Sequence, residues 1–104
     1  MTVHRKLVRD RIPELIRAEG RQPVVTILQR EERRAALLAK LVEEAAEAAG
    51  ADDGLAEELA DVLEVVRALA ATLGLSLAQV GELADTKKAT RGGFEGGTFL
   101  VEVV

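Results

Sequence analysis

The sequence LVEEAAEAAGADDGLAEELADVLE occupies residues 41–64 and holds nine acidic residues without a basic one. Both flanks have helical periodicity, and the GADDG segment between them is typical of a turn. Four carboxylates form two i, i+3 pairs, Glu44 with Glu47 and Glu58 with Asp61. Because residues three apart share one face of a helix, an antiparallel helix pair would bring the two pairs together. The pattern predicts a four-carboxylate cage for a hard divalent cation.

Helical periodicity sets these carboxylates at different angles to the apolar faces. At about 100° per residue, Glu58 falls inside the apolar face of the second helix and Asp61 just past its edge. Glu44 lies at the margin of the apolar face of the first helix, and Glu47 lies one step beyond. A carboxylate turned towards a core is costly unless a cation or donor meets it, which favours a metal at Glu58. The alternative, a solvated acidic face, fits Glu57 and Glu64, which point towards solvent.

The composition predicts one small domain over residues 1–104. Apolar residues make up 48% of the chain, but Phe94 and Phe99 are its only aromatic residues, so Leu, Val, Ile and Ala must form the core. The chain has no cysteine, which excludes disulfides, zinc–thiolate sites and a cysteine nucleophile. The charged N-terminus lacks the apolar stretch of a signal peptide, and no apolar run could span a membrane. We therefore expect a soluble cytoplasmic protein without a membrane partner.

The net charge of −4 is unevenly distributed. Residues 1–34 contain nine Lys or Arg against five acidic residues, whereas residues 41–64 are purely acidic. A protein that binds nucleic-acid polymers usually shows a basic excess without such an acidic centre. An acidic centre with a basic periphery is better suited to a metal ion and a polyphosphate.

Capping and periodicity signals predict a mainly α helical bundle with a short two-stranded β appendage. The expected elements are helices over about 11–19, 30–49, 54–73 and 77–90, and strands over 23–28 and 98–104. Asp10 is expected to cap the first helix and Ser76 the last. The two strands would pair with each other, because a lone strand leaves its backbone groups without partners. The expected inner face of the last helix consists of Leu77, Val80, Leu83 and Ala84.

Missing motifs exclude several chemistries. The chain has no GxxxxGK[ST] sequence, so it has no P-loop. His4 is the only histidine, and the two Glu-x-x-His motifs of di-iron bundles cannot be built from it. The ADDGL segment lacks the alternating acids of an EF-hand. The glycine-rich RGGFEGG loop could wrap phosphate through its backbone amides, but it could equally be a plain turn. Metal held by carboxylates, acting with water, is the chemistry that remains.

The chain resembles the all-α nucleoside triphosphate pyrophosphohydrolases, that is, the MazG-like and phosphoribosyl-ATP pyrophosphohydrolase-like superfamily. The ExxE signature of that family is similar to EEAAE here, and its ExxD signature to EELADVLEV. The segments KLVRDRIPELI and KKATRGGF resemble a small bacterial subgroup, so the resemblance covers nearly the whole chain. One departure is the spacer of ten residues between Glu47 and Glu58, which is shorter than usual in the family.

The resemblance implies hydrolysis of a nucleoside triphosphate between its α and β phosphates. The products would be a monophosphate and pyrophosphate, as in house-cleaning of the nucleotide pool. The implied cofactor is Mg²⁺, or Mn²⁺, and its implied ligands are Glu44, Glu47, Glu58 and Asp61. The candidate general base, acting through a water, is Glu43. The candidate phosphate contacts are Lys6, Arg9, Lys87, Lys88 and Arg91. Phe94 is expected either to stack on a base or to belong to the core.

The resemblance also implies a homodimer or homotetramer built from paired helical hairpins. A thin core in so small a chain points the same way, because small domains bury too little surface to be very stable alone. The competing hypothesis is a non-catalytic helical module for oligomerisation or regulation, which the amphipathic helices would also suit. Metal-dependent release of pyrophosphate separates the two. The sequence does not identify the base, the sugar, or whether the nucleotide is normal or damaged.

Overall fold

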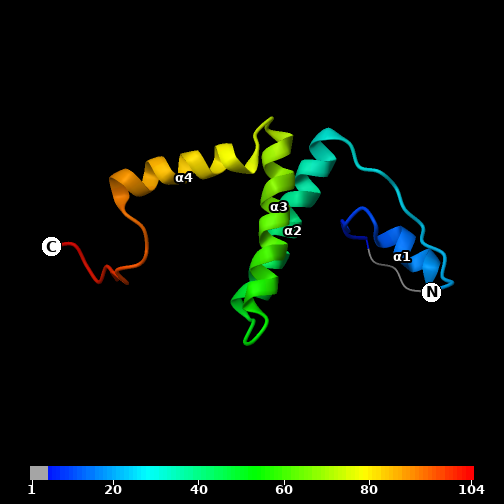
Figure 1. Cartoon of the computed structure of the whole chain (residues 1–104), viewed down its shortest axis with the longest axis horizontal. Coiled ribbons are helices and arrows are strands. Elements are labelled where there is room, and N and C mark those ends of the chain that lie inside the picture. Colours follow the sequence, from blue (N-terminus) through cyan, green and yellow to red (C-terminus); the bar gives the residue numbers. More distant parts are fainter. Residues whose placement is uncertain (1–4) are drawn as a thin grey trace.

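The structure is a computed structural model that describes residues 5–104, and it is mainly helical. Along the chain lie α1 (Ile12–Ala18), α2 (Arg30–Ala49), α3 (Leu55–Thr72) and α4 (Leu77–Arg91) (Figure 1). These bounds agree with the predicted helices to within one residue at each end. His4 lies outside the described residues. Over residues 5–104, the helices lack the combination of length and apolar character that crossing a membrane requires.

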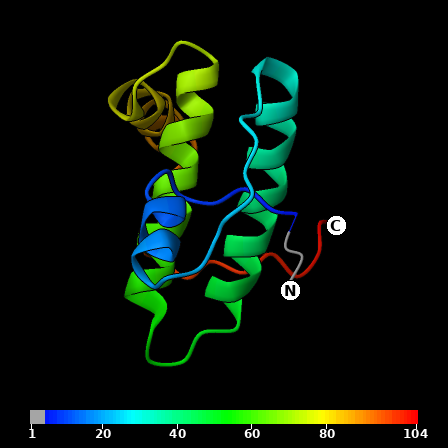
Figure 2. The ribbon, with the colours of Figure 1, turned by 90° about the vertical axis from the view of Figure 1, so that its right-hand side faces the viewer.

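The antiparallel hairpin of α2 and α3 is the centre of the fold (Figures 1 and 2). Its interface buries Leu37 from α2 together with Val65 and Ala70 from α3. At the open end of the hairpin, Arg34 donates from Nε to Thr72 Oγ1 (3.1 Å) and from a terminal nitrogen to the Thr72 carbonyl oxygen (2.7 Å). The hairpin is therefore held by a few aliphatic contacts along its length and by a polar clamp at one end.

The predicted cap of α4 is confirmed, and that of α1 is wrong. Ser76 Oγ accepts from the Gln79 backbone N–H (3.1 Å), and Gln79 Oε1 accepts from the Ser76 backbone N–H (2.8 Å), which completes a capping box. At the start of α1 the N-cap residue is Arg11 rather than Asp10, and it makes no side-chain cap bond. Its backbone is already helical, and a cap side chain needs an extended backbone there to reach back to the first turn.

The predicted two-stranded β appendage is not formed by this chain. Residues 23–28 and 98–104 contain no strand, and neither does the rest of the described chain. The two segments lie on opposite sides of the α2–α3 hairpin, so they cannot exchange backbone hydrogen bonds (Figure 1). Their side chains are largely exposed, with Val24 and Val104 among the most exposed apolar residues. Local β-propensity is therefore present in both segments, but the tertiary arrangement provides no partner.

The chain is elongated, and much of its apolar surface stays uncovered. Its radius of gyration is 17.9 Å, against about 13 Å expected for a compact domain of this length. α4 projects away from α3, so part of its predicted inner face, Leu83 and Ala84, is exposed (Figure 1). On the hairpin, Leu38, Val42 and Leu59 are each at least half exposed. A single copy therefore leaves the apolar faces of its helices only partly buried.

The clamp at the open end of the hairpin gives a testable prediction. Arg34→Ala should lower the free energy of unfolding by about 1 kcal/mol, because it removes two hydrogen bonds from a charged donor. In a domain of this size the melting temperature should fall by about 5 °C. The matched control is Arg67→Ala, which removes only an exposed ion pair with Glu64 within one helix and should cost about 0.5 kcal/mol or less. Equal losses in the two variants, measured by thermal unfolding, would contradict the clamp.

Candidate metal centre

Three glutamates from the two arms of the hairpin converge near its turn. Glu44, Glu47 and Glu58 each offer one carboxylate oxygen, and these oxygens lie within 4.8 Å of one another. Glu44 and Glu47 are one turn apart on α2, and Glu58 lies in the first turn of α3. Oxygen ligands about 2.1 Å from a Mg²⁺ are about 3 Å apart when adjacent and about 4.2 Å apart when opposite. The cluster is therefore close to the spacing of a divalent-cation site.

Burial of these carboxylates destabilises the folded chain unless a cation binds them. Glu44 is only 8% exposed, and the Oε2 atoms of Glu44 and Glu58 are both buried without a hydrogen-bond partner. Burial raises the pKa of Glu44, and the neighbouring Glu47 carboxylate raises this pKa further, while Lys40 opposes the shift. Glu58 gains support from its place at the helix N-terminus, where the helix dipole favours a carboxylate. Two unpaired acceptors in one small cluster are what a metal ion or a shared proton would satisfy.

The sequence predicted Glu58 as the carboxylate deepest in the core, whereas the structure buries Glu44 more. Glu44 is buried and Glu58 is half-buried. The segment before α1 crosses the hairpin on the side that Figure 2 shows. Ile12 and Val8 from this part of the chain line a pocket together with Glu44.

Asp61 adjoins the cluster without belonging to it. Its Oδ1 accepts a hydrogen bond from an Arg9 terminal nitrogen at 2.7 Å, which is also an ion pair. The Asp61 charge still contributes to the raised pKa of Glu44, so the two carboxylates are near each other. Three of the four predicted ligands are therefore brought together, and the fourth is held beside them by a cation from the N-terminal segment.

A pocket of about 310 Å³ opens between the N-terminal segment and the hairpin. It is lined by Lys6, Val8, Arg9, Ile12, Lys40, Glu44 and Asp61. Two of the predicted phosphate contacts, Lys6 and Arg9, therefore lie beside the carboxylates. The predicted general base, Glu43, is only partly exposed, and one of its oxygens lies 3.6 Å from the Lys40 ammonium nitrogen.

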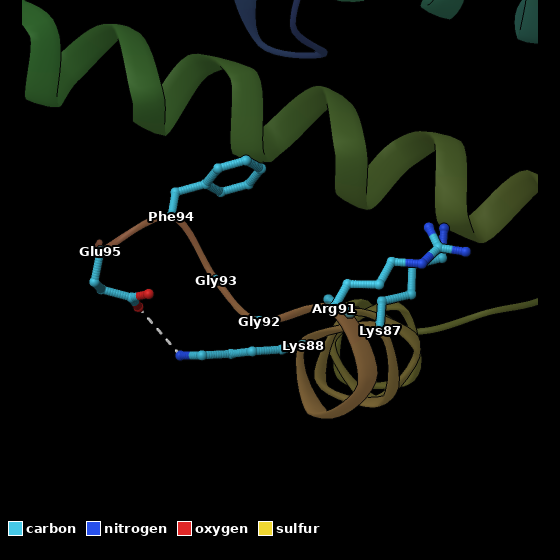
Figure 3. Close-up of a pocket in the computed structure, with 8 residues that line it drawn as sticks. Lys87, Lys88, Arg91, Gly92, Gly93, Phe94 and Glu95 are labelled. Carbon is cyan, nitrogen blue, oxygen red and sulfur yellow. Dashed lines mark hydrogen bonds and ion pairs between the residues drawn. The ribbon is translucent and has the colours of Figure 1, made fainter. Parts of the chain in front are cut away.

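The other three predicted phosphate contacts lie elsewhere. Lys87, Lys88 and Arg91 line a second pocket, of about 710 Å³, at the C-terminal end of α4. Figure 3 shows Lys87 and Arg91 extending together to one side, while Lys88 extends to the other and pairs with Glu95 (3.2 Å). α4 projects away from the hairpin, so one chain does not bring these cations to the carboxylates (Figure 1). Phe94 is 99% exposed, which shows that its alternative place in the core is wrong for the single chain.

Lys40 is the site residue that the sequence reasoning missed. Its ammonium nitrogen lies 3.6 Å from a carboxylate oxygen of Glu43 and 3.6 Å from one of Glu44, and its side chain is only 18% exposed. The i, i+3 and i, i+4 spacing of Lys40 to these two glutamates was a signal that could have found it. The pairing of Arg9 with Asp61 had no such signal, because the two residues are 52 positions apart.

Comparisons with known proteins leave the identity of this site open. No family model matches the chain, and no solved structure matches it. A stretch of 47 residues is 64% identical to part of a protein of Mycolicibacterium smegmatis that is described as uncharacterized. The match covers 45% of this chain and 48% of that protein, so it spans about half the length of the relative. The resemblance to MazG-like proteins stays a prediction, and function has to be argued from the site.

The raised pKa of Glu44 predicts how stability depends on pH. Folding lifts this pKa above its ordinary value of 4.5, so the folded chain binds the Glu44 proton up to a higher pH than the unfolded chain does. The contribution of Glu44 to stability is therefore present below pH 4.5 and is lost as the pH rises through the raised pKa. Glu44→Gln should remove this loss, and the metal-free variant should melt at a higher temperature than the unmodified chain at pH 7.

The measurement is thermal unfolding across this pH range in the presence of a chelator. Glu57→Gln is the matched control, because Glu57 lies next to the cluster on α3 but is exposed. It should leave the pH dependence unchanged. A lower melting temperature for Glu44→Gln at pH 7 would mean that its charged form is well satisfied in the folded chain.

Proposed function

We propose that this protein is a metal-dependent nucleoside triphosphate pyrophosphohydrolase, which cleaves between the α and β phosphates and releases pyrophosphate. The observation that carries the proposal is that Glu44 and Glu58 each have one buried carboxylate oxygen without a hydrogen-bond partner, with Glu47 beside them and a cationic pocket adjoining. In a purely structural cluster the buried acceptors would be satisfied by donors, whereas two buried oxygens have no hydrogen-bond partner here. The resemblance of the sequence to MazG-like proteins supplies the reaction class.

The donor set suits Mg²⁺ or Mn²⁺. All three clustered ligands are carboxylates, which hard cations prefer, and the chain has no cysteine and only one histidine for softer metals. Mg²⁺ is usually held by a few carboxylates together with waters and substrate phosphates, so an incomplete protein cage is expected for it. Glu47 is exposed, which leaves one side of the cluster open to solvent and substrate. Asp61 would join as a fourth ligand once it is released from Arg9.

The residues of the chain then have separate roles in the reaction. A bound divalent cation would neutralise phosphate charge and lower the pKa of a bound water. Glu43, next to Glu44 and partly exposed, would accept the proton of the attacking water. Lys6 and Arg9 would hold phosphate oxygens on the side of the pocket opposite the carboxylates. Attack at the α-phosphorus would break its bond to the bridging oxygen, and that oxygen would leave with pyrophosphate.

The reaction is tested by product analysis with Mg²⁺ or Mn²⁺ and a panel of natural and damaged nucleotides. We expect monophosphate and pyrophosphate as the primary products, with label from heavy-oxygen water in the monophosphate. Label only in pyrophosphate would mean attack at the β-phosphorus, and orthophosphate as the primary product would refute this class of enzyme. The same panel would identify the base and sugar.

Variants of the cluster connect activity to metal. In the unmodified chain Mg²⁺ or Mn²⁺ should raise the melting temperature, because a ligand of the folded state stabilises it by mass action. Glu58→Gln should abolish most of this rise, and Asp61→Asn should lower the hydrolysis rate by about 100-fold or more. The control Glu57→Gln removes the neighbouring exposed charge and should change neither quantity by much. An unchanged metal response in Glu58→Gln would remove Glu58 from the site.

We also propose that the protein is a homo-oligomer, at least a dimer. Counted at about 100° per residue from the buried Leu37 and Val65, several exposed apolar side chains fall on one side of the hairpin. They are Leu38, Val42, Leu59 and Leu63. Glu47 and Asp61 point to the opposite side by the same count. A second copy on the apolar side would cover this face without blocking the carboxylates, and it would supply the core that the single chain lacks.

Light scattering at micromolar concentration tests the assembly. We expect a dimer or tetramer, and Leu59→Lys should shift it towards monomer with a lower melting temperature, because a charge would be buried at the interface. Glu64→Lys is the control, because it places the same charge on α3 away from the apolar side. A monomeric unmodified chain would sink the proposal. In a monomer, the segments 23–28 and 98–104 could not form the predicted strands by pairing with a second copy either.

The second candidate function is a non-catalytic module for oligomerisation or regulation. The exposed apolar side of the hairpin favours it as much as it favours an oligomeric enzyme. The buried carboxylates do not, since a pure assembly module has no need of them. If Mg²⁺ or Mn²⁺ raises the melting temperature but no pyrophosphate is released, the protein is a metal-stabilised module and not an enzyme of this class. Location in the cytoplasm, with no partner among membranes or nucleic-acid polymers, stays part of the proposal.

A further inference from the structure

The pocket between the N-terminal segment and the hairpin has an unusual composition for a structural crevice. Three of its seven lining residues, Lys6, Arg9 and Lys40, are cations, and two, Glu44 and Asp61, are carboxylates. The cations come from two elements far apart in sequence, with Lys40 on α2 and the other two before α1. These charges therefore meet only because the N-terminal segment crosses the hairpin (Figure 2).

Lys40 is poorly satisfied by the residues around it. Its side chain is 18% exposed, and its two carboxylate neighbours are both 3.6 Å away, beyond hydrogen-bond range. Over residues 5–104 its ammonium group makes no hydrogen bond, although it has three donors. The stem of Lys40 is mostly buried while its ammonium keeps free donors beside the pocket, so it can receive acceptors from a ligand there.

Arg9 is satisfied in a way that metal binding would disturb. One of its terminal nitrogens donates a hydrogen bond to Asp61 Oδ1 at 2.7 Å. A divalent cation on the cluster would draw in the carboxylates and repel the guanidinium. The planar guanidinium is suited to two oxygens of one phosphoryl group. The pocket would then contain free cations on two walls and would need an anion.

We infer that this pocket holds a phosphoryl group of the metal-bound substrate, with Lys40 as its inner cation and Arg9 as the cation on the facing wall. The inference rests on the proposed function for the identity of the ligand, a polyphosphate chelated by the divalent cation. In this inference Lys40 contacts the substrate as well as the glutamates. Arg9 gives up its bond to Asp61 and binds a phosphate oxygen instead. The pocket volume of about 310 Å³ is at the lower end of ligand sites, as a phosphate group requires.

Calorimetry of the full chain with inorganic pyrophosphate at saturating Mg²⁺ tests this inference. The unmodified chain should bind pyrophosphate, and Lys40→Met should weaken that binding by about tenfold or more, since it removes a charge-assisted bond. Lys40→Arg should restore most of the affinity. Arg67→Met is the matched control: it removes one positive charge from an exposed site on α3, and it should leave pyrophosphate affinity unchanged. No binding to the unmodified chain would overturn the inference.

The role of Lys40 in holding the glutamates is separated by measuring Mg²⁺ affinity in the same variants. If Lys40 only positions Glu43 and Glu44, its loss should alter Mg²⁺ affinity but leave pyrophosphate affinity at saturating Mg²⁺ unchanged. That result would refute phosphate binding by Lys40 in this pocket. Should Lys40→Met fail to fold, Arg9→Gln tests the facing wall, and full pyrophosphate affinity in that variant would also refute it.

Failure of the pocket and failure of the proposed function are distinguishable because pyrophosphate binding requires no hydrolysis. If the chain binds pyrophosphate through Lys40 but releases no product from any nucleotide, the phosphate pocket is supported and the proposed enzyme activity is refuted. If the unmodified chain hydrolyses nucleotides, and both Lys40→Met and Arg9→Gln keep full pyrophosphate affinity, the enzyme activity is supported and the phosphate pocket is refuted.

Discussion

The burial of Glu44 at the interface of two helices is the constraint on which the rest of the site depends. A carboxylate that is 8% exposed and has an unpartnered oxygen is unfavourable in the free chain. The chain meets part of that cost with Lys40, one turn away on the same helix, and burial still raises the pKa of Glu44. The metal-free protein is therefore expected to sacrifice stability at this point, as functional sites commonly do.

The N-terminal segment is what converts a hairpin with acidic residues into a pocket. Val8 from this segment lines the pocket with Glu44, and Arg9 reaches Asp61 at 2.7 Å. The segment is tied to the hairpin by the Arg9–Asp61 ion pair. This combination links the basic periphery of the chain to its acidic centre.

The elongated shape and the exposed apolar surface are the two features on which the proposed oligomer rests. The hairpin buries only three apolar residues within residues 5–104, and its side opposite Glu47 and Asp61 is apolar and exposed. The α4 cations, including Lys87 and Arg91, lie in a pocket remote from the carboxylates of their own chain. The proposed assembly through the apolar side would bury that surface.

The sequence by itself determined the local features of this protein. The bounds of α2, α3 and α4, the Ser76 capping box and the approach of Glu44 and Glu47 to Glu58 follow from periodicity, capping and a short turn, all of which depend on nearby residues. Only the tertiary structure decided that Glu44 is buried more deeply than Glu58, that residues 23–28 and 98–104 do not pair, and that the α4 cations stand apart. It also brought Arg9 to Asp61 across 52 positions and placed both beside Lys40 in one pocket. Those outcomes depend on where separate elements come to lie in space, and no local pattern of residues encodes that placement.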